Sequence, residues 1–164
     1  MKISRVKVYL LYSRFVYLKV ETDEGICGWE EAIHHGGRIT AQISRSLGDR
    51  IVGRDPFQID AIWQELFQSG SCVGNTGAYV AALGALDIAL YDIKGRALGT
   101  PVWNLLGGKF RDQVEVYSSL MQRDLPPEKD VERVHSRMEQ GYTWVKLLHT
   151  ATAWGLDRGR ETKL

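Results

Sequence analysis

The first 32 residues alternate between hydrophobic and polar positions, which is the pattern of half-buried β-strands. Residues 3–10 and 15–20 both alternate in this way. The turn signal "TDEG" follows the second segment and is itself followed by a third strand-like segment, residues 26–32. Short turns between consecutive strands require antiparallel pairing. The pattern therefore predicts a three-stranded antiparallel meander.

The spacing of apolar positions then changes from two residues to about four, which indicates helices. One amphipathic helix is predicted over residues 38–51. After the break at "GRDP", a second helix is predicted to start after Pro56 and to run to about Gln68, and "SGSCVGNTG" is predicted to be a loop. The apolar positions of the first helix are Ile39, Ile43, Leu47 and Ile51.

The longest predicted element is a helix over residues 76–99, which carries one stripe of large apolar residues and a second stripe of alanines. Two apolar stripes predict a helix that is packed on both sides. Thr76 is the expected N-cap. Gly99, followed by Pro101, is expected to end the helix.

Two carboxylates, Asp87 and Asp92, interrupt the apolar surface of this helix. An ionised carboxylate in a low-dielectric environment is costly unless it is paired. We therefore expect structural pairing of both residues with nearby Arg or Lys side chains. A catalytic role for one of them is the alternative.

After residue 108 the chain reads as strand, helix and strand, over residues 113–120, 126–141 and 142–148. This order predicts a βαβ unit with parallel strands. One such unit cannot close a barrel, so the parallel part is expected to be incomplete.

The predicted organisation therefore has three parts. Residues 1–108 form an α+β domain, residues 109–150 begin an α/β domain, and residues 151–164 form a polar tail that is truncated or divergent.

The composition fits a folded domain with a small-molecule partner. Of the 164 residues, 44% are hydrophobic, and the 21 Lys and Arg residues balance 20 Asp and Glu residues. This balance leaves no basic surface for nucleic acid or an anionic membrane. No apolar run approaches the ~20 residues that span a bilayer, and the opening "MKISRVKVYLLYSR" lacks the apolar core of a signal peptide. We expect a cytoplasmic protein.

Four separated segments resemble the enolase superfamily, specifically its mandelate racemase and muconate-lactonizing branch. In that family an α+β capping domain precedes a (β/α)₇β TIM-like barrel. The resemblance thus implies that residues 1–108 are the capping domain and that residues 109–150 are the first βαβ unit of an incomplete barrel. The segments are "VETDEGICGWEEA" at 20–32, "GRDPFQIDAIWQELF" at 53–67, "ALGALDIALYDIKGRALGTPVWNLLGG" at 82–108 and "RDQVEVYSSL" at 111–120.

Within this branch, the chain looks most like acid-sugar dehydratases of the galactonate dehydratase type. Such enzymes abstract the proton α to a sugar-acid carboxylate and expel the β-hydroxyl group, while Mg²⁺ stabilises the ene-diolate. An α-proton beside a carboxylate is very weakly acidic, so the intermediate needs a cation and a nearby acid or base. The resemblance implies a sugar acid or another small carboxylate as substrate.

The resemblance also assigns a role to Lys146. Family members with a lysine base carry Lys-x-Lys at the end of the second barrel strand, where the first lysine supports the second. Lys146 matches the first lysine, but Leu148 stands where the base would be. Members of the galactonate dehydratase type also lack the second lysine, which favours a dehydratase over a racemase. A register shift that brings His149 to this position is the alternative.

The family's metal ligands come from the third, fourth and fifth barrel strands, which lie beyond this chain, so we expect no metal ligand within it. Asp157 and Glu161 are expected to be solvated. Loops of the capping domain help to select substrate in the family. They correspond here to residues 12–14 and 33–38.

In the first of these loops Arg14 could pair with a carboxylate or hydroxyl group of the substrate, or simply remain an exposed arginine. In the second, His34 and His35 are neighbours and point to opposite sides in extended backbone, so at most one belongs to a site.

The sequence thus predicts the N-terminal portion of a Mg²⁺-dependent enzyme of this superfamily, inactive by itself and homo-oligomeric. A racemase or cycloisomerase of the same superfamily is the alternative enzyme. A non-catalytic capping-domain fragment that binds a partner chain is the alternative outside enzymes.

Overall fold

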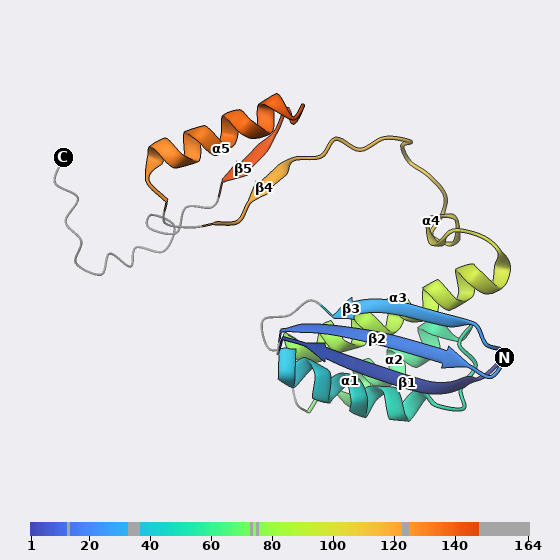
Figure 1. Cartoon of the computed structure of the whole chain (residues 1–164). Helices are drawn as coiled ribbons and strands as arrows, with labels where there is room; N and C mark the ends of the chain where they lie inside the picture. The colour runs from blue at the N-terminus through green and yellow to red at the C-terminus, as the bar shows by residue number, and fades with distance from the viewer. Residues whose placement is uncertain (13, 33–36, 73, 75, 123–124, 148–164) are drawn as a thin grey trace. The chain divides into compact units, whose positions relative to one another are not determined.

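The structure is a computed structural model that describes every residue except 13, 33–36, 73, 75, 123–124 and 148–164. The chain divides into two compact units, residues 1–109 and 110–164, and each is described by itself (Figure 1).

The first unit contains the predicted meander. Strands β1 (Ile3–Leu11), β2 (Phe15–Thr22) and β3 (Cys27–Ala32) form one sheet in the order β1-β2-β3, and both pairings are antiparallel. Opposite residues share a face of the sheet, as Val8 does with Leu18. The alternation in the sequence therefore separates a buried face of β2 from a face on which the side chains are partly exposed.

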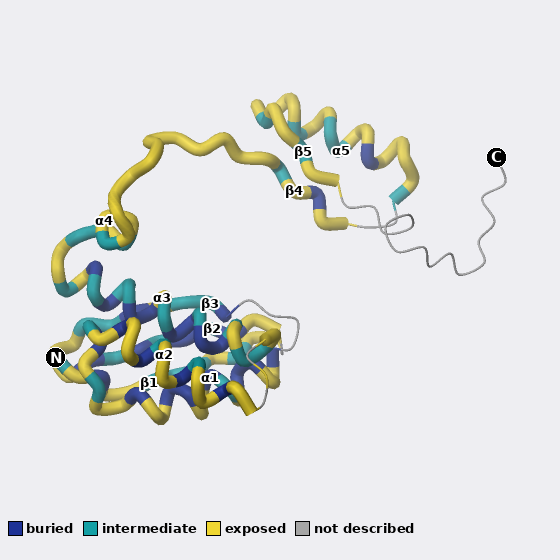
Figure 2. The backbone as a smooth tube through the Cα atoms, turned by 180° about the vertical axis from the view of Figure 1, so that it is seen from behind, coloured by how far each residue is buried: buried dark blue, intermediate teal, exposed yellow. Residues whose placement is uncertain are grey.

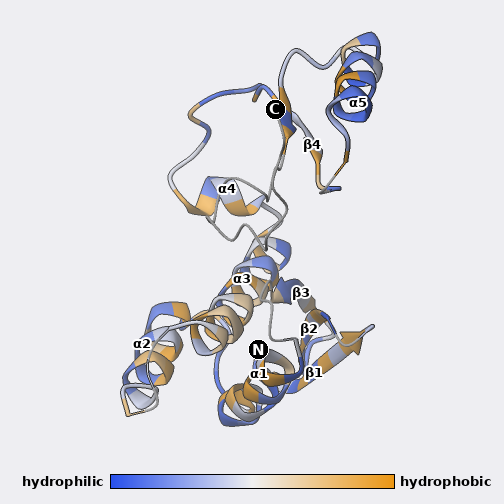
Figure 3. Cartoon of the chain, turned by 90° about the vertical axis from the view of Figure 1, so that its left-hand side faces the viewer, coloured by the Kyte–Doolittle hydropathy of each residue, from blue (hydrophilic) through white to orange (hydrophobic). Residues whose placement is uncertain are grey.

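Helices cover one face of this sheet, as Figure 3 shows from the side. Helices α1 (Gly37–Ile51) and α3 (Ala78–Leu98) contact the strands, and α2 (Ile59–Ser69) contacts α3. Helix α3 therefore packs against both the sheet and the other helices, as its two apolar stripes predicted. A short helix, α4 (Val102–Leu105), follows it.

The core of this unit lies between the sheet and the helices, where Figure 2 shows the buried positions. Burial of large aliphatic side chains supplies the main stabilising free energy, about 1.5–3 kcal/mol for each. The largest fully buried aliphatic residues are Ile3, Val16, Leu18, Val20, Ile51, Ile62, Leu66, Leu83, Leu86, Leu90 and Ile93.

The two ends of α3 differ in how well they were predicted. Gly99 ends the helix in the left-handed conformation, with φ of 62°, as expected. The prediction that Thr76 caps the other end is wrong, because the N-cap residue is Gly77 and no side chain bonds to the cap. Gly77 has φ of 57°, a backbone geometry that glycine adopts readily and threonine does not.

Helix α2 begins at Ile59, two residues later than the predicted start directly after Pro56. The Asp55 carboxylate accepts a hydrogen bond from the Phe57 backbone N–H at 2.9 Å, and the Gln58 N–H donates to the Asp55 carbonyl at 3.2 Å. These bonds form a turn of the type that Asp favours. The turn delays the helix until Ile59.

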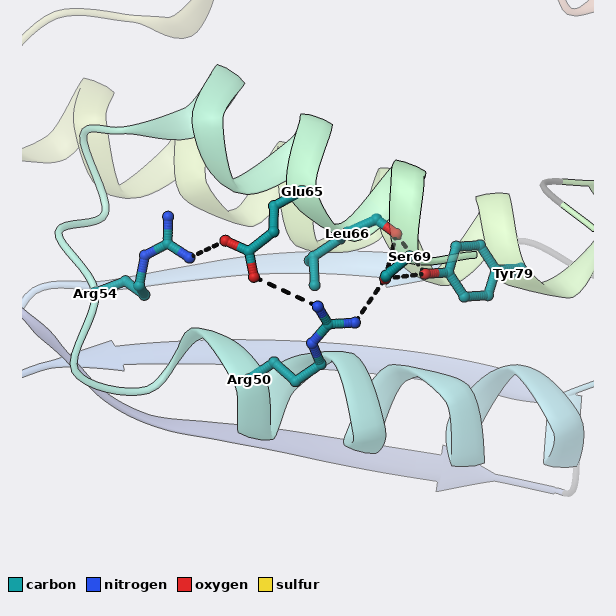
Figure 4. Close-up of polar contacts among 6 residues, drawn as sticks. All are labelled: Arg50, Arg54, Glu65, Leu66, Ser69 and Tyr79. Carbon is teal, nitrogen blue, oxygen red and sulfur yellow. Dashed lines mark hydrogen bonds and ion pairs between the residues drawn. The ribbon is translucent and has the colours of Figure 1, made fainter. Parts of the chain in front are cut away.

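Polar side chains join the three long helices at the surface (Figure 4). The Glu65 carboxylate accepts hydrogen bonds from Arg54 at 2.6 Å and from Arg50 at 3.4 Å. Arg50 also donates to the Ser69 hydroxyl at 2.6 Å. The hydroxyl groups of Ser69 and Tyr79 both donate to the carbonyl oxygen of Leu66. This network fixes the last turn of α2 between α1 and α3.

The second unit contains the predicted βαβ arrangement. Strands β4 (Ser118–Leu120) and β5 (Val145–Leu147) pair in parallel, and α5 (Pro127–Glu139) connects them. Both strands are shorter than the predicted segments 113–120 and 142–148. In the described part of this unit, Leu120 and Asp130 are the only buried residues.

None of the helices in the described residues has the length and apolar character needed to cross a bilayer.

Candidate functional site

The parallel pair in the second unit has two different faces. Leu147 lines a pocket together with residues of α5, among them Val131 and Val134. Leu147 also lines a second groove, but it is the member of β5 that shares a pocket with α5, which places its side chain on the helix side. Side chains alternate along a strand, so Lys146 points to the opposite, helix-free face.

Residues of β5 and of the segments before β4 and β5, Lys146 included, line an open groove of about 730 Å³. The Lys146 ammonium nitrogen lies 5.7 Å from the centroid of the Tyr117 ring, within the range of a cation–π interaction. The large groove-lining side chains Tyr117 and Trp144 are 55% and 62% exposed. The groove is lined by Glu115, Val116, Tyr117, Trp144, Val145, Lys146 and Leu147.

Lys146 also lies at the end of the strands where ligands bind in α/β folds. It is in register with Ser119, one residue before the last residue of β4, and is itself one residue before the end of β5. Ligands of parallel α/β folds bind at the carboxyl ends of the strands. A lysine here can present its charge to a bound anion.

Arg14 lies in the first unit, in the tight turn between β1 and β2. Its backbone N–H donates to the Leu11 carbonyl at 3.0 Å, and Tyr12 closes the turn with φ of 51°. The Arg14 guanidinium lies 5.5 Å from the centroid of the Phe15 ring and is exposed. This geometry leaves its planar donors accessible to a ligand.

His34 and His35 lie outside the described residues. The strand before them, β3, ends with Ala32 paired to Val16, next to the start of β2. This strand end and the turn that carries Arg14 therefore share one end of the sheet.

Several further predictions concern residues beyond the described part of the chain. The positions expected at and after the end of the second barrel strand, Leu148 and His149, lie there, as do Asp157 and Glu161. Their predicted roles stay predictions.

The two carboxylates of α3 behave differently. Asp92 accepts hydrogen bonds from the Arg96 guanidinium at 3.0 Å and from the Trp29 backbone N–H at 3.1 Å, which confirms the predicted structural pairing. Asp87 forms no ion pair with a described Arg or Lys. Burial raises the pKa of Asp87, and the charge of Asp60 raises it further. Its side chain lies among apolar residues between α2 and α3.

A metal site does not form among the described residues, which contain no group of three His, Cys, Asp or Glu side chains able to hold an ion. Asp92 is paired with Arg96, and Glu21 with Lys7 and Lys19, so these carboxylates are committed to structural contacts. The described residues therefore do not fit a Mg²⁺ ion.

The sequence interpretation missed Tyr117. The available signal was the alternation of Glu115, Tyr117 and Ser119 within one strand-like segment. Deciding that these residues face away from the helix requires knowing which face α5 covers, and the periodicity does not determine this.

The fold of the first unit and a match to a family profile define the class of protein. The chain belongs to the mandelate racemase and muconate lactonizing enzyme branch of the enolase superfamily, because the sequence profile of that family's N-terminal domain matches residues 6–107. A curated relative, D-galactonate dehydratase of Variovorax paradoxus (strain S110), is 42% identical over 119 residues. The match covers 72% of this chain and 31% of the relative.

Solved structures show the same architecture. A member of the enolase superfamily from Salmonella Typhimurium superposes with a TM-score of 0.78 at 29% identity, covering 89% of this chain and 42% of that one. A mandelate racemase/muconate lactonizing protein from Paracoccus denitrificans PD1222, complexed with magnesium, superposes with a TM-score of 0.79 at 26% identity. That match covers 88% of this chain and 41% of the other. The chain thus spans less than half the length of these proteins.

Proposed function

We propose that this chain is the N-terminal part of an acid-sugar dehydratase, an enzyme that removes a proton α to a carboxylate and expels a β-hydroxyl group. The observation that carries the proposal is the position of Lys146 on the helix-free face, at the carboxyl end of a parallel strand. The D-galactonate dehydratase relative supports a sugar acid as the substrate class.

In this proposal residues 110–147 begin a barrel. The face opposite α5 becomes the interior, where side chains of barrel strands point. Two exposed aromatic side chains just before β4 and β5 fit this arrangement, because further strands would enclose them. Tyr117 and Trp144, which share the face of Lys146, are 55% and 62% exposed.

Lys146 supplies positive charge in this site. Proton abstraction places a second negative charge on the substrate carboxylate, so a nearby fixed cation stabilises the transition state more than the ground state. Lys146 has no ion-pair partner among the described residues, and its charge is therefore available for this purpose. Abstraction of the proton itself is assigned to a residue of later strands, since leucine occupies position 148.

The capping domain supplies substrate contacts in this proposal. Arg14 is assigned to the distal hydroxyl groups or the carboxylate of the sugar acid, because a guanidinium offers several donors in one plane. One of His34 and His35 is assigned to the same role. The turn that carries Arg14 and the last residue of β3, Ala32, lie at the same end of the sheet. This supports the assignment of Arg14 and one of the two histidines to the same substrate.

We also propose that the complete enzyme depends on Mg²⁺, is cytoplasmic and forms homo-oligomers. The magnesium complex of the Paracoccus denitrificans protein supports the metal requirement. Because the described residues hold no metal site, no step assigned to this chain involves the metal. By itself the chain is proposed to be inactive.

A chimera tests this function against the non-catalytic alternative. Residues 1–147 would replace the matching segment of the Variovorax paradoxus D-galactonate dehydratase, and formation of the keto-deoxy acid from D-galactonate would be measured with Mg²⁺. Activity within about 10²-fold of the parent enzyme supports a dehydratase. A folded chimera that binds Mg²⁺ but produces no keto-deoxy acid would favour a non-catalytic module.

A further inference from the structure

Several lysines of this chain are held by carboxylates. Lys7 and Lys19 both lie 2.8 Å from the Glu21 carboxylate, and Lys129 lies 2.8 Å from Glu132. Such pairing fixes the ammonium group, but it also compensates the charge. A lysine held in this way attracts a further anion only weakly.

Lys146 is held differently. Its ammonium lies over the Tyr117 ring at 5.7 Å, and no described carboxylate pairs with it, although Glu115 lines the same groove. An aromatic face attracts a cation through its quadrupole without neutralising the charge. The ring can therefore restrict the ammonium while leaving its full charge available to an anion.

The backbone supports this pairing of side chains. The Ser118 N–H donates to the carbonyl of Trp144 at 3.0 Å, and the register joins Ser119 to Lys146. Tyr117 lies two residues before Ser119, on the same face of the sheet. The two strands thus hold the Tyr117 ring diagonally across from Lys146, independently of α5.

We propose that Tyr117 is a positioning residue for Lys146. The ring holds the flexible four-carbon side chain of Lys146 over the groove. Binding of a substrate carboxylate then does not carry the full entropic cost of ordering that side chain. A role of this contact in catalysis rests on the proposed function. The contact between Lys146 and Tyr117 does not.

Nuclear magnetic resonance of the 164-residue chain with ¹³C-labelled lysine tests the contact. The Lys146 ε-methylene protons are expected upfield of ordinary lysine positions, with nuclear Overhauser contacts to the Tyr117 ring protons. Tyr117→Phe keeps the ring and should retain the upfield shift, while Tyr117→Leu should abolish it. Lys109, which lies 5.0 Å from the Trp103 ring centroid, is the matched control and should not change in either variant.

Absence of Overhauser contacts in the wild-type chain overturns the proposal, and this result needs no variant to fold. The proposal is equally overturned if Lys146 has the same shift in the wild type and in a folded Tyr117→Leu variant.

Titration with L-malate, a small hydroxy-dicarboxylate, separates this inference from the proposed function. If both hold, malate shifts the Lys146 signals and binds two- to fivefold more weakly to Tyr117→Leu, the change expected from loss of an exposed cation–π contact. If Lys146 shows the ring contact but Lys146→Met leaves kcat of the chimera unchanged, the positioning contact stands and the assignment of Lys146 to carboxylate binding fails.

Discussion

The backbone carbonyl of Ala89, in α3, occupies the space into which a side chain on Gly28, in β3, would have to extend. A Cβ atom at Gly28 would overlap the Ala89 carbonyl oxygen and would lie 3.0 Å from Cγ1 of Ile93. Strand β3 and helix α3 can therefore pack this closely only because residue 28 has no side chain.

This close approach predicts that Gly28→Ala lowers the free energy of unfolding by about 2–3 kcal/mol, since overpacking forces backbone to move. Gly84→Ala is the control, because Gly84 lies in the same helix and a Cβ atom added there would meet nothing within 4 Å. This second change should stabilise the chain by about 0.5–1 kcal/mol through helix propensity. Urea denaturation followed by circular dichroism measures both, and equal effects of the two changes would refute the packing explanation.

Asp87 should destabilise the folded chain at neutral pH. Its pKa is raised by burial and by Asp60, so folding disfavours the ionised form. The folded state then binds more protons than the unfolded state, and stability falls as the pH rises above the ordinary value of 3.8.

Asp87→Asn is therefore expected to stabilise the chain at pH 7 by about 0.5 kcal/mol, a size typical of partly exposed sites. The gain should disappear well below pH 3.8, where both states are protonated. Thermal denaturation across this pH range measures the difference. A loss of stability at pH 7 would show instead that the carboxylate has a stabilising partner.

Glu21 should titrate far below an ordinary glutamate. Hydrogen bonds from Lys19 and then Lys7 lower its pKa from 4.5 to about 2. Its contribution to stability is thus complete above pH 4.5 and is lost as the pH falls through about 2. Carboxyl ¹³C resonances can follow this titration. Lys19→Met should raise the pKa of Glu21, whereas Lys129→Met, at a distant ion pair, should leave it unchanged.

Magnesium should not bind stoichiometrically to this chain alone. The described residues lack a cluster of ligands, and the proposed function assigns the ligands to later strands. Isothermal titration calorimetry of the 164-residue chain should show no binding in the micromolar range. Saturable 1:1 binding in that range would direct attention to ligands among Asp157, Glu161 and the histidines at positions 34 and 35.

Much of the fold could be predicted because its signals are local. Alternation gave the three strands of the meander, and the four-residue spacing gave α1 and most of α3. The predicted helix starts were wrong where the backbone conformation of one or two residues determines where the helix begins. Gly77, rather than Thr76, is the N-cap of α3, because the backbone there has a positive φ. Asp55 delays the start of α2 with a turn.

The candidate site was harder to predict, because it depends on which side chains meet across strands. The family resemblance suggested Lys146 as a candidate, and its role stays a prediction. The resemblance did not indicate the contact with Tyr117, which requires the register between β4 and β5. The ion pair of Asp92 was predictable, because Arg96 follows it by four residues in the same helix. The apolar environment of Asp87 was not, because it depends on how α2 packs against α3.

The most direct test of the central claim is the effect of Lys146→Met on the chimera with the Variovorax paradoxus enzyme. A fixed charge that stabilises the transition state should cost about 10²–10³-fold in kcat when it is removed, the range seen for single stabilising groups. Lys146→Arg should retain more activity than Lys146→Met, because it keeps the charge. We predict this loss in kcat with folding and Mg²⁺ binding intact. An active chimera in which Lys146→Met leaves kcat unchanged would contradict the assignment of this lysine to the active site.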